Sequence, residues 1–185
     1  MRYPPSHKAE SREKLVRSSA ALAKEKGFAV SGVDALTSAA GLTSGAFYRH
    51  FESKDELLAD IVASELEKTK RTFGAIDGSS RDTLLAVVDA YLSLAHVRTP
   101  SAGCVLPTLS SEVGRAGPET KAAYERALFE VIAILTEKLG DRSLATAVVA
   151  QCAGAVMLAR AMDSDAAKRD VLQAARLGVR RMIEA

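Results

Sequence analysis

Residues 33–54, which read VDALTSAAGLTSGAFYRHFESK, decide the fold of this chain. A short helix pattern over residues 33–40 stops at Gly41, because glycine readily supplies the left-handed residue that ends a helix. Thr43 can cap a second short helix over residues 44–51. Two short helices joined through Gly41 predict a helix-turn-helix, whose second helix can enter a DNA major groove while the first crosses the backbone.

The side chains of this stretch divide into an inner and an outer set. Small residues allow the two helices to approach closely, and bulky apolar residues supply a small core. The inner set comprises Ala35, Leu36, Ala39, Ala40, Leu42, Ala46, Phe47 and Phe51. The outer set has the polar groups and positive charge that DNA contacts require, and it comprises Thr43, Ser44, Gly45, Tyr48, Arg49 and His50.

Signals on both sides of this stretch complete a small N-terminal unit. A first helix is predicted over residues 10–26, because Gly27 follows it and Phe28 is placed to pack back against it. The residues SKDE at positions 53–56 match the S-x-x-E capping box. A fourth helix therefore begins there and extends to about Phe73.

The rest of the chain also predicts helices. Strand patterns are almost absent and apolar residues recur at spacings of three and four, so the fold class is all-α. Glycines, prolines and polar runs separate predicted helices over residues 81–97, 106–113, 119–139, 143–162 and 166–183. We place the domain boundary at the start of the fourth helix, between a DNA-binding domain at 1–54 and a helical domain at 55–185.

Composition limits the class of protein. The net charge is +2, but residues 1–54 carry nine Lys or Arg against five Asp or Glu, whereas residues 55–185 carry 16 against 18. The basic excess fits a phosphate backbone, although a solvated surface explains the charge equally well. The two cysteines form no CxxC pair, so neither a disulfide nor a metal site is predicted. Without a membrane-length apolar run or a secretory pattern, we expect a cytoplasmic protein that contacts no membrane.

The sequence FYRHFESKDELL, following AGLTSGA, resembles the recognition helix and fourth-helix start of the TetR family of transcriptional regulators. The similarity covers about a third of the chain, and the matching residues are Gly27, Phe28, Val33, Ala40, Gly41, Phe47, Tyr48, His50, Phe51 and Lys54. Gly32 departs from the pattern, since Thr is common at that position. The resemblance implies a homodimeric repressor that binds palindromic double-stranded operator DNA and is released by a small molecule.

The chemistry of the matched positions assigns roles at the DNA. Ser44 and Gly45 are predicted to approach base edges, and Thr43 serves as a helix cap or a DNA contact. Tyr48 and His50 are predicted to bind phosphates, while Arg49 reaches either a phosphate or solvent. Phosphate contacts are also expected from Lys54, at a helix N-terminus, and from the backbone N–H groups of Ser31 and Gly32.

The C-terminal part carries no catalytic signature. Its histidines are scattered, and neither an HExxH pattern nor a glycine-rich phosphate loop occurs, so no enzyme and no cofactor are predicted. The helix pattern within residues 143–162 is apolar nearly all round, which favours a subunit interface. In the TetR family the last two long helices pair with those of a second subunit, and the resemblance implies the same role here.

The resemblance also implies a ligand cavity in the C-terminal domain. The side chains that we expect to line it are Tyr91, Leu92, Cys104, Leu109, Tyr124, Phe129 and Met157. For any one of these residues, ordinary core packing is the stronger interpretation.

A separate hypothesis concerns Cys104. Pro107 is tolerated only in the first turn of a helix, so this helix is predicted to begin near Gly103 or Cys104, where the helix dipole favours a thiolate. The Gly-Cys pair also resembles that of TetR-like repressors that sense electrophiles or oxidants. The stronger interpretation is a small buried apolar side chain.

Two other functions compete with a repressor. One is a helical small-molecule-binding or thiol-redox sensing protein with little DNA affinity, which the set Tyr48, His50 and Lys54 argues against. The other is an enzyme that uses Cys104 as a nucleophile, for which only His96 is a nearby base in the sequence.

Overall fold

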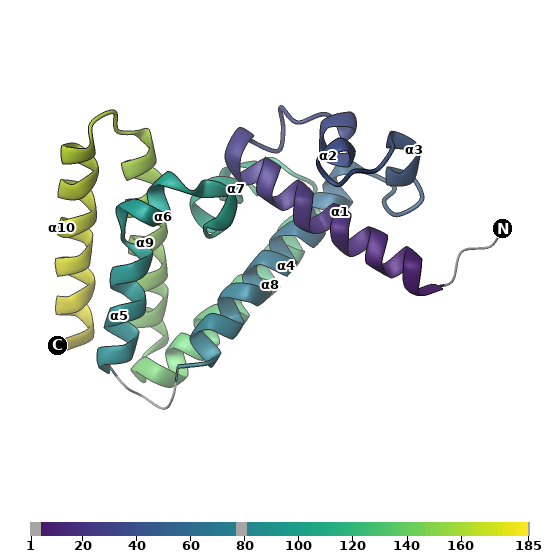
Figure 1. The fold of residues 1–185 in the computed structure, drawn as a ribbon. Helices are drawn as coiled ribbons and strands as arrows, with labels where there is room; N and C mark the ends of the chain where they lie inside the picture. Colours follow the sequence, from purple (N-terminus) through teal and green to yellow (C-terminus); the bar gives the residue numbers. More distant parts are fainter. Residues whose placement is uncertain (1–4, 77–80, 185) are drawn as a thin grey trace.

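The computed structural model describes residues 5–76 and 81–184, and these residues form helices and turns without a strand (Figure 1). The predicted all-α fold is confirmed. The helices are α1 (Pro5–Lys26), α2 (Val33–Ala39), α3 (Ser44–Phe47), α4 (Lys54–Gly74), α5 (Arg81–Tyr91), α6 (Leu94–Arg98), the short 3₁₀ turn η1 (Pro100–Ala102), α7 (Leu106–Val113), α8 (Pro118–Leu139), α9 (Arg142–Ala161) and α10 (Asp165–Glu184).

The helices are arranged in two groups joined by a long pair (Figure 1). Helices α1, α2 and α3 lie together at one end, and α5, α9 and α10 stand side by side at the other. The paired helices α4 and α8 run between the two groups, and α7 lies between α1 and α9. The helix-turn-helix is therefore far from α10, and α1 connects it to α4.

Two glycines end the first helices as the sequence predicts. Gly27 has φ +91° and Gly41 has φ +64°, a backbone region that favours glycine over residues with a side chain. Phe28 follows the first of these turns and is buried in the core. The difference from the prediction is the start of α1, which begins at Pro5 rather than near residue 10.

The cap at the start of α4 forms its serine half as predicted, while the glutamate half is shifted by one residue. Ser53 Oγ accepts a hydrogen bond of 3.1 Å from the N–H of Glu56, and the Glu56 carboxylate accepts one of 2.7 Å from the N–H of Glu52. Beyond this cap, Leu57, Ile61 and other apolar residues of α4 are buried in a single core that reaches from α1 to α10. The domain boundary between residues 54 and 55 remains a prediction, because the core continues across it.

Two predicted helices are shorter or divided. The helix expected over residues 44–51 ends at Phe47, because the N–H of His50 turns back to the Phe47 carbonyl at 2.8 Å. The helix expected over residues 81–97 is interrupted after Tyr91, since Ser93 Oγ accepts the His96 N–H and begins α6. Hydroxyl caps of this kind favour a new helix start over continuation.

The helix expected to begin at Gly103 or Cys104 begins later. The first helical residue of α7 is Leu106, with Pro107 in the first turn as the sequence predicts. Cys104 therefore lies two residues before the helix, and its Sγ accepts a hydrogen bond of 3.4 Å from the Leu106 N–H. The thiol still faces the positive end of a helix, but from outside the first turn.

Helix α9 is unusually apolar. By length and composition alone it could cross a membrane, and 33% of its most apolar window is buried within one chain. A core or interface helix of a soluble protein has the same composition. Asp141 caps this helix through a 2.9 Å hydrogen bond from the Leu144 N–H, and α10 packs along it.

Candidate functional site

The outer face of the helix-turn-helix presents the predicted DNA-contacting side chains to solvent. Tyr48 is 69% exposed, and Thr43, Gly45 and Arg49 are exposed beside it. The Tyr48 ring lies edge-on to the buried Phe47 ring, with 5.2 Å between centroids. An exposed phenol held against an anchored ring is well placed to meet a partner outside the chain.

Ser44 has a partner that the sequence did not predict. Its Oγ donates a hydrogen bond to a carboxylate oxygen of Asp34, which lies in the first turn of α2. Thr43, the N-cap of α3, makes no side-chain capping bond. The Asp34 carboxylate therefore joins the two short helices at the surface expected to face DNA, and the side chain of Thr43 remains available for contact.

Two of the predicted phosphate ligands turn toward the protein. Ser31 is buried, its Oγ donates to the Gly27 carbonyl at 2.7 Å, and its N–H donates to the Phe28 carbonyl at 3.2 Å. The Lys54 ammonium donates to the carbonyls of Phe28, Ala29 and Ser31 at 3.1, 3.3 and 2.8 Å. The ammonium thus closes the turn between α1 and α2. Contact between Lys54 and a DNA phosphate stays a prediction. It would require the ammonium to leave these carbonyl oxygens for phosphate oxygens.

Gly32 and His50 lie at the edges of this surface. Gly32 is exposed at the start of α2, and the position of a Cβ there has open space around it. His50 is half-buried, and its Nδ1 is buried without a hydrogen-bond partner. Burial, together with the positive charges of Lys8, Arg49 and Arg12, lowers the pKa of His50, so the imidazole is neutral at pH 7. A neutral ring can donate only one N–H to a phosphate.

Polar contacts connect the turn after α1 to α7, and the start of α4 to the start of α8. The Glu112 carboxylate on α7 accepts hydrogen bonds from the N–H groups of Phe28 and Ala29 at 2.8 and 2.6 Å. The Asp55 carboxylate accepts one from the Gly117 N–H at 3.1 Å. These contacts span more than 60 residues of sequence, and the sequence pattern gave no signal for them.

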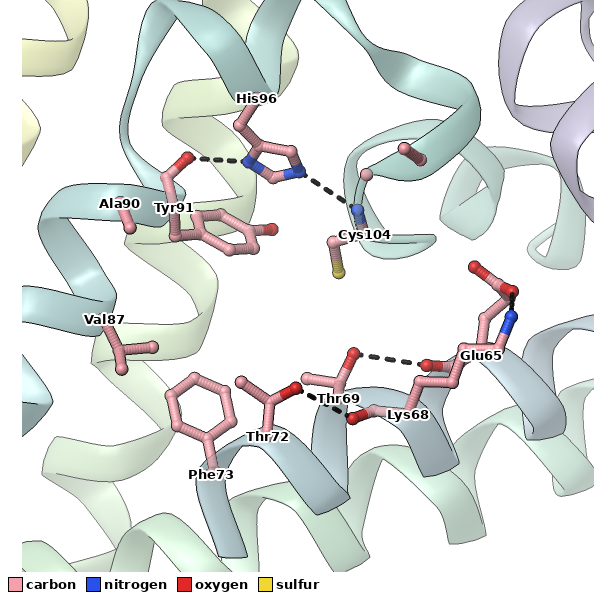
Figure 2. Close-up of a pocket in the computed structure, with 12 residues that line it drawn as sticks. Glu65, Lys68, Thr69, Thr72, Phe73, Val87, Ala90, Tyr91, His96 and Cys104 are labelled. Atoms are coloured by element: carbon pink, nitrogen blue, oxygen red, sulfur yellow. Dashed lines mark hydrogen bonds and ion pairs between the residues drawn. The ribbon is translucent and has the colours of Figure 1, made fainter. Parts of the chain in front are cut away.

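A cavity of about 400 Å³ lies between α4, α5 and the segment that precedes α7 (Figure 2). One wall is largely polar and comes from α4, and the opposite wall carries apolar side chains and a thiol. The lining residues are Glu65, Lys68, Thr69, Thr72, Phe73, Val87, Ala90, Tyr91, His96, Ala102, Gly103 and Cys104. The volume is within the range of small-molecule sites.

Two of the seven side chains predicted to line a ligand cavity line this one. Tyr91 and Cys104 face it, with the Cys104 thiol directed toward α4 (Figure 2). The other five lie elsewhere: Leu92 and Leu109 are in the core, Tyr124 shares a hydrogen bond with Ser110, Phe129 is exposed under the Arg142 guanidinium, and Met157 is exposed on α9. The cavity-lining residues of α4 were not predicted, because the sequence pattern of one helix does not show which of its polar side chains other segments will cover.

His96 links the backbone of Tyr91 to that of Cys104 in the wall of this cavity. Its Nδ1 lies 2.6 Å from the Tyr91 carbonyl oxygen and its Nε2 accepts the Cys104 N–H at 3.0 Å, so the proton is on Nδ1 (Figure 2). Burial lowers the pKa of His96, which keeps this neutral form. Burial, with a contribution from the neighbouring Cys104, raises the pKa of Tyr91, so its phenol stays protonated. The sequence suggested His96 as a base, but its Nε2 is occupied by a backbone N–H.

The two cysteines differ in their surroundings. Cys104 is half-buried at the cavity, whereas Cys152 is buried in α9. Burial raises the pKa of the Cys152 thiol to about 12. Among residues 5–76 and 81–184, no group of three or more His, Cys, Asp or Glu side chains is placed to hold a metal ion.

Comparison with known proteins identifies relatives of the N-terminal unit. Residues 15–61 match the sequence model for bacterial regulatory proteins of the tetR family. The transcriptional repressor NemR of Escherichia coli is 26% identical over 134 residues, which cover 70% of this chain and 67% of that protein. The HTH-type regulator YerO of Bacillus subtilis, whose name marks it as uncharacterised, is 41% identical over 49 residues, covering 26% of this chain and 17% of that protein.

Solved structures share the fold over nearly the whole chain. The reduced form of Escherichia coli NemR superposes with a TM-score of 0.78 at 22% identity, covering 93% of this chain and 96% of that one. A TetR regulator from Chloroflexus aurantiacus gives a TM-score of 0.76 at 24% identity, with 97% and 96% covered. These relatives are named as transcriptional regulators and not as enzymes.

The carbonyl contacts of Lys54 predict a role in stability. Replacing Lys54 with Met should lower the free energy of unfolding by about 1–2 kcal/mol, because two part-buried carbonyls and one exposed carbonyl lose their donor. Urea unfolding followed by circular dichroism measures the change. Arg49→Met is the matched control, since it removes the same charge from an exposed position. Equal stability of the two variants would contradict a structural role for Lys54.

Proposed function

We propose that this chain is a transcriptional repressor of the TetR family, released from DNA by a small molecule. The observation that carries this proposal is the exposed outer face of α3, with Tyr48 held against a buried ring. The cavity borders α4, the helix that also packs against α1. A structural change in the cavity can therefore reach the DNA-binding surface through α4 and α1. We also propose that the protein acts in the cytoplasm.

The proposed DNA contacts follow from exposure and chemistry. Thr43, Ser44 and Gly45 approach base edges at the start of α3, where the absence of a side chain on Gly45 allows close approach. Phosphates are contacted by Tyr48, His50 and Arg49, and by the backbone at Gly32. Lys54 contributes positive charge close to the same surface, whether or not it leaves its carbonyl ligands.

Selection of bound fragments from genomic DNA by the purified protein tests the function. We expect recovery of a short, approximately palindromic duplex, since each recognition helix reads only a few base pairs and twofold symmetry doubles the site. Binding should weaken steeply with salt. Recovery of no sequence above background would favour the alternative, a small-molecule-binding or thiol-sensing protein with little DNA affinity.

Tyr48→Ala should weaken binding to the selected duplex at least tenfold, about 1.4 kcal/mol, while leaving the fold intact. Fluorescence anisotropy across a salt titration measures this change. Val30→Ala is the matched control, because Val30 is also exposed and belongs to the same unit. A Tyr48→Ala protein that binds like the parent at every salt concentration would remove Tyr48 from the interface.

We propose that α9 and α10 form the dimer interface. Met157, Leu158 and Leu177 are large apolar side chains exposed on these helices, and a second copy would bury them. Light scattering at micromolar concentration should give twice the 19.6 kDa mass of one chain. Leu158→Arg should shift the mass toward one chain, since an arginine cannot be buried in this face without a partner. A parent protein that is monomeric while binding the operator fully would contradict the proposal.

The cavity is the proposed effector site, and the Cys104 thiol is its reactive group. Iodoacetamide should alkylate Cys104: sulfur bonds to the methylene carbon, iodide leaves, and the thiol proton passes to solvent. Cys152 should react far more slowly, because its raised pKa keeps the thiol protonated. Mass spectrometry locates the adduct, and operator release is followed in parallel. Release that persists in Cys104→Ser, or is absent in the parent, would leave Cys104 as a packing residue.

A further inference from the structure

We infer that Lys24 couples the cavity to the helix-turn-helix, through the carboxylate of Glu65 and the carbonyl of Gly103. The inference rests on the proposed function, because it explains how an occupant of the cavity reaches the DNA-binding surface. It assigns Lys24 as a positioning residue, which contacts neither DNA nor the occupant.

Lys24 lies in the last turn of α1 and is only 5% exposed. Its ammonium donates to Glu65 Oε2 on α4 at 2.5 Å and to the Gly103 carbonyl at 2.8 Å. Glu65 is 7% exposed, and its other oxygen accepts from Lys68 at 2.5 Å. One ammonium of the N-terminal unit is thus bound by two distant segments of the chain.

Both partners of Lys24 line the cavity, whereas Lys24 does not. Figure 2 shows the Glu65 side chain on the α4 wall and Cys104, the neighbour of Gly103, on the opposite wall. An occupant between these walls must contact or displace one of them. Either event changes the position of an oxygen that Lys24 needs.

The Gly103 segment has little freedom to absorb such a displacement locally. A Cβ on Gly103 would lie 2.7 Å from the His96 ring and 3.0 Å from Arg160 Nη2, so packing around the backbone is already tight. His96 also accepts the Cys104 N–H at 3.0 Å and contacts the Tyr91 carbonyl. A displacement of Cys104 therefore also moves the Gly103 carbonyl, because the tightly packed segment cannot absorb it.

A buried ammonium tolerates the loss of its partners poorly. Separating a buried ion pair leaves a charge without compensation, so the Lys24 side chain must follow its oxygens or α1 must move. The last turn of α1 leads directly through Gly27 into the turn before α2. Movement there changes the orientation of α2 and α3 relative to α4.

The test compares the loss of operator affinity caused by a filled cavity in matched proteins. The filler is a carbamidomethyl group placed on Cys104 by iodoacetamide, and the readout is the ratio of operator dissociation constants with and without it. Lys24→Met removes the ammonium and keeps the apolar stem. Lys70→Met is the control, because Lys70 also forms ion pairs, with Glu67 and Glu130, but its side chain is more exposed and does not line the cavity.

We expect a ratio of about tenfold in the parent and in Lys70→Met, within the usual range of coupling between sites, and less than twofold in Lys24→Met. A merely structural Lys24 would lower thermal stability and leave the ratio unchanged, which would overturn the inference. A parent ratio near one would overturn it as well, since a filled cavity would then have no effect to transmit.

A second measurement needs neither the variant nor DNA. Amide hydrogen exchange of the parent should become faster in the last turn of α1, including the Gly27 N–H bonded to the Ala23 carbonyl, after alkylation of Cys104. Unchanged exchange in this turn would overturn the inference even if Lys24→Met fails to fold. If the parent binds no duplex in the selection, the proposed function fails, while this measurement still decides the coupling.

Discussion

The apolar side of α4 is the constraint on which the rest of the structure depends. Its first turns bury Leu57 and Leu58, and later turns bury Ile61, Val62 and Leu66 in the same core. The helix packs against α1 and, along most of its length, against α8. Because a single helix belongs to both parts of the chain, neither part can change its packing without moving an element of the other.

Local chemistry explains which features could be predicted from sequence. The glycines at positions 27 and 41 and the capping box at Ser53 act within a few residues, so their effect is visible in the pattern. The exposure of Tyr48 could also be predicted, because the neighbouring Phe47 supplies the buried side chain of this short helix. Ser93 was overlooked because a hydroxyl inside a helical pattern can either point outward or cap a new helix, and periodicity does not distinguish these outcomes.

The remaining features depend on contacts between distant segments. Lys54 looked like a phosphate ligand from its place at a helix start, yet its nearest oxygens are carbonyls about 25 residues earlier. The cavity was expected from family resemblance, but its polar wall belongs to α4, whose own pattern shows only an amphipathic helix. In the same way, the pairing of Lys24 with Glu65 is decided by how α1 crosses α4, which no local signal encodes.

The glycines of this chain differ in whether the surrounding structure leaves room for a side chain. Gly32 and Gly45, on the outer face of the helix-turn-helix, have open space where a Cβ would stand, so other residues fit there without displacing a neighbour. Gly103 has no such space, and even a methyl group would collide with the His96 ring. A side chain at Gly45 would thus occupy the space proposed for a base edge of DNA and leave the fold intact, whereas one at Gly103 would disturb the packing beside the cavity. Substitutions at these glycines would therefore affect the proposed recognition surface and the internal packing independently of each other.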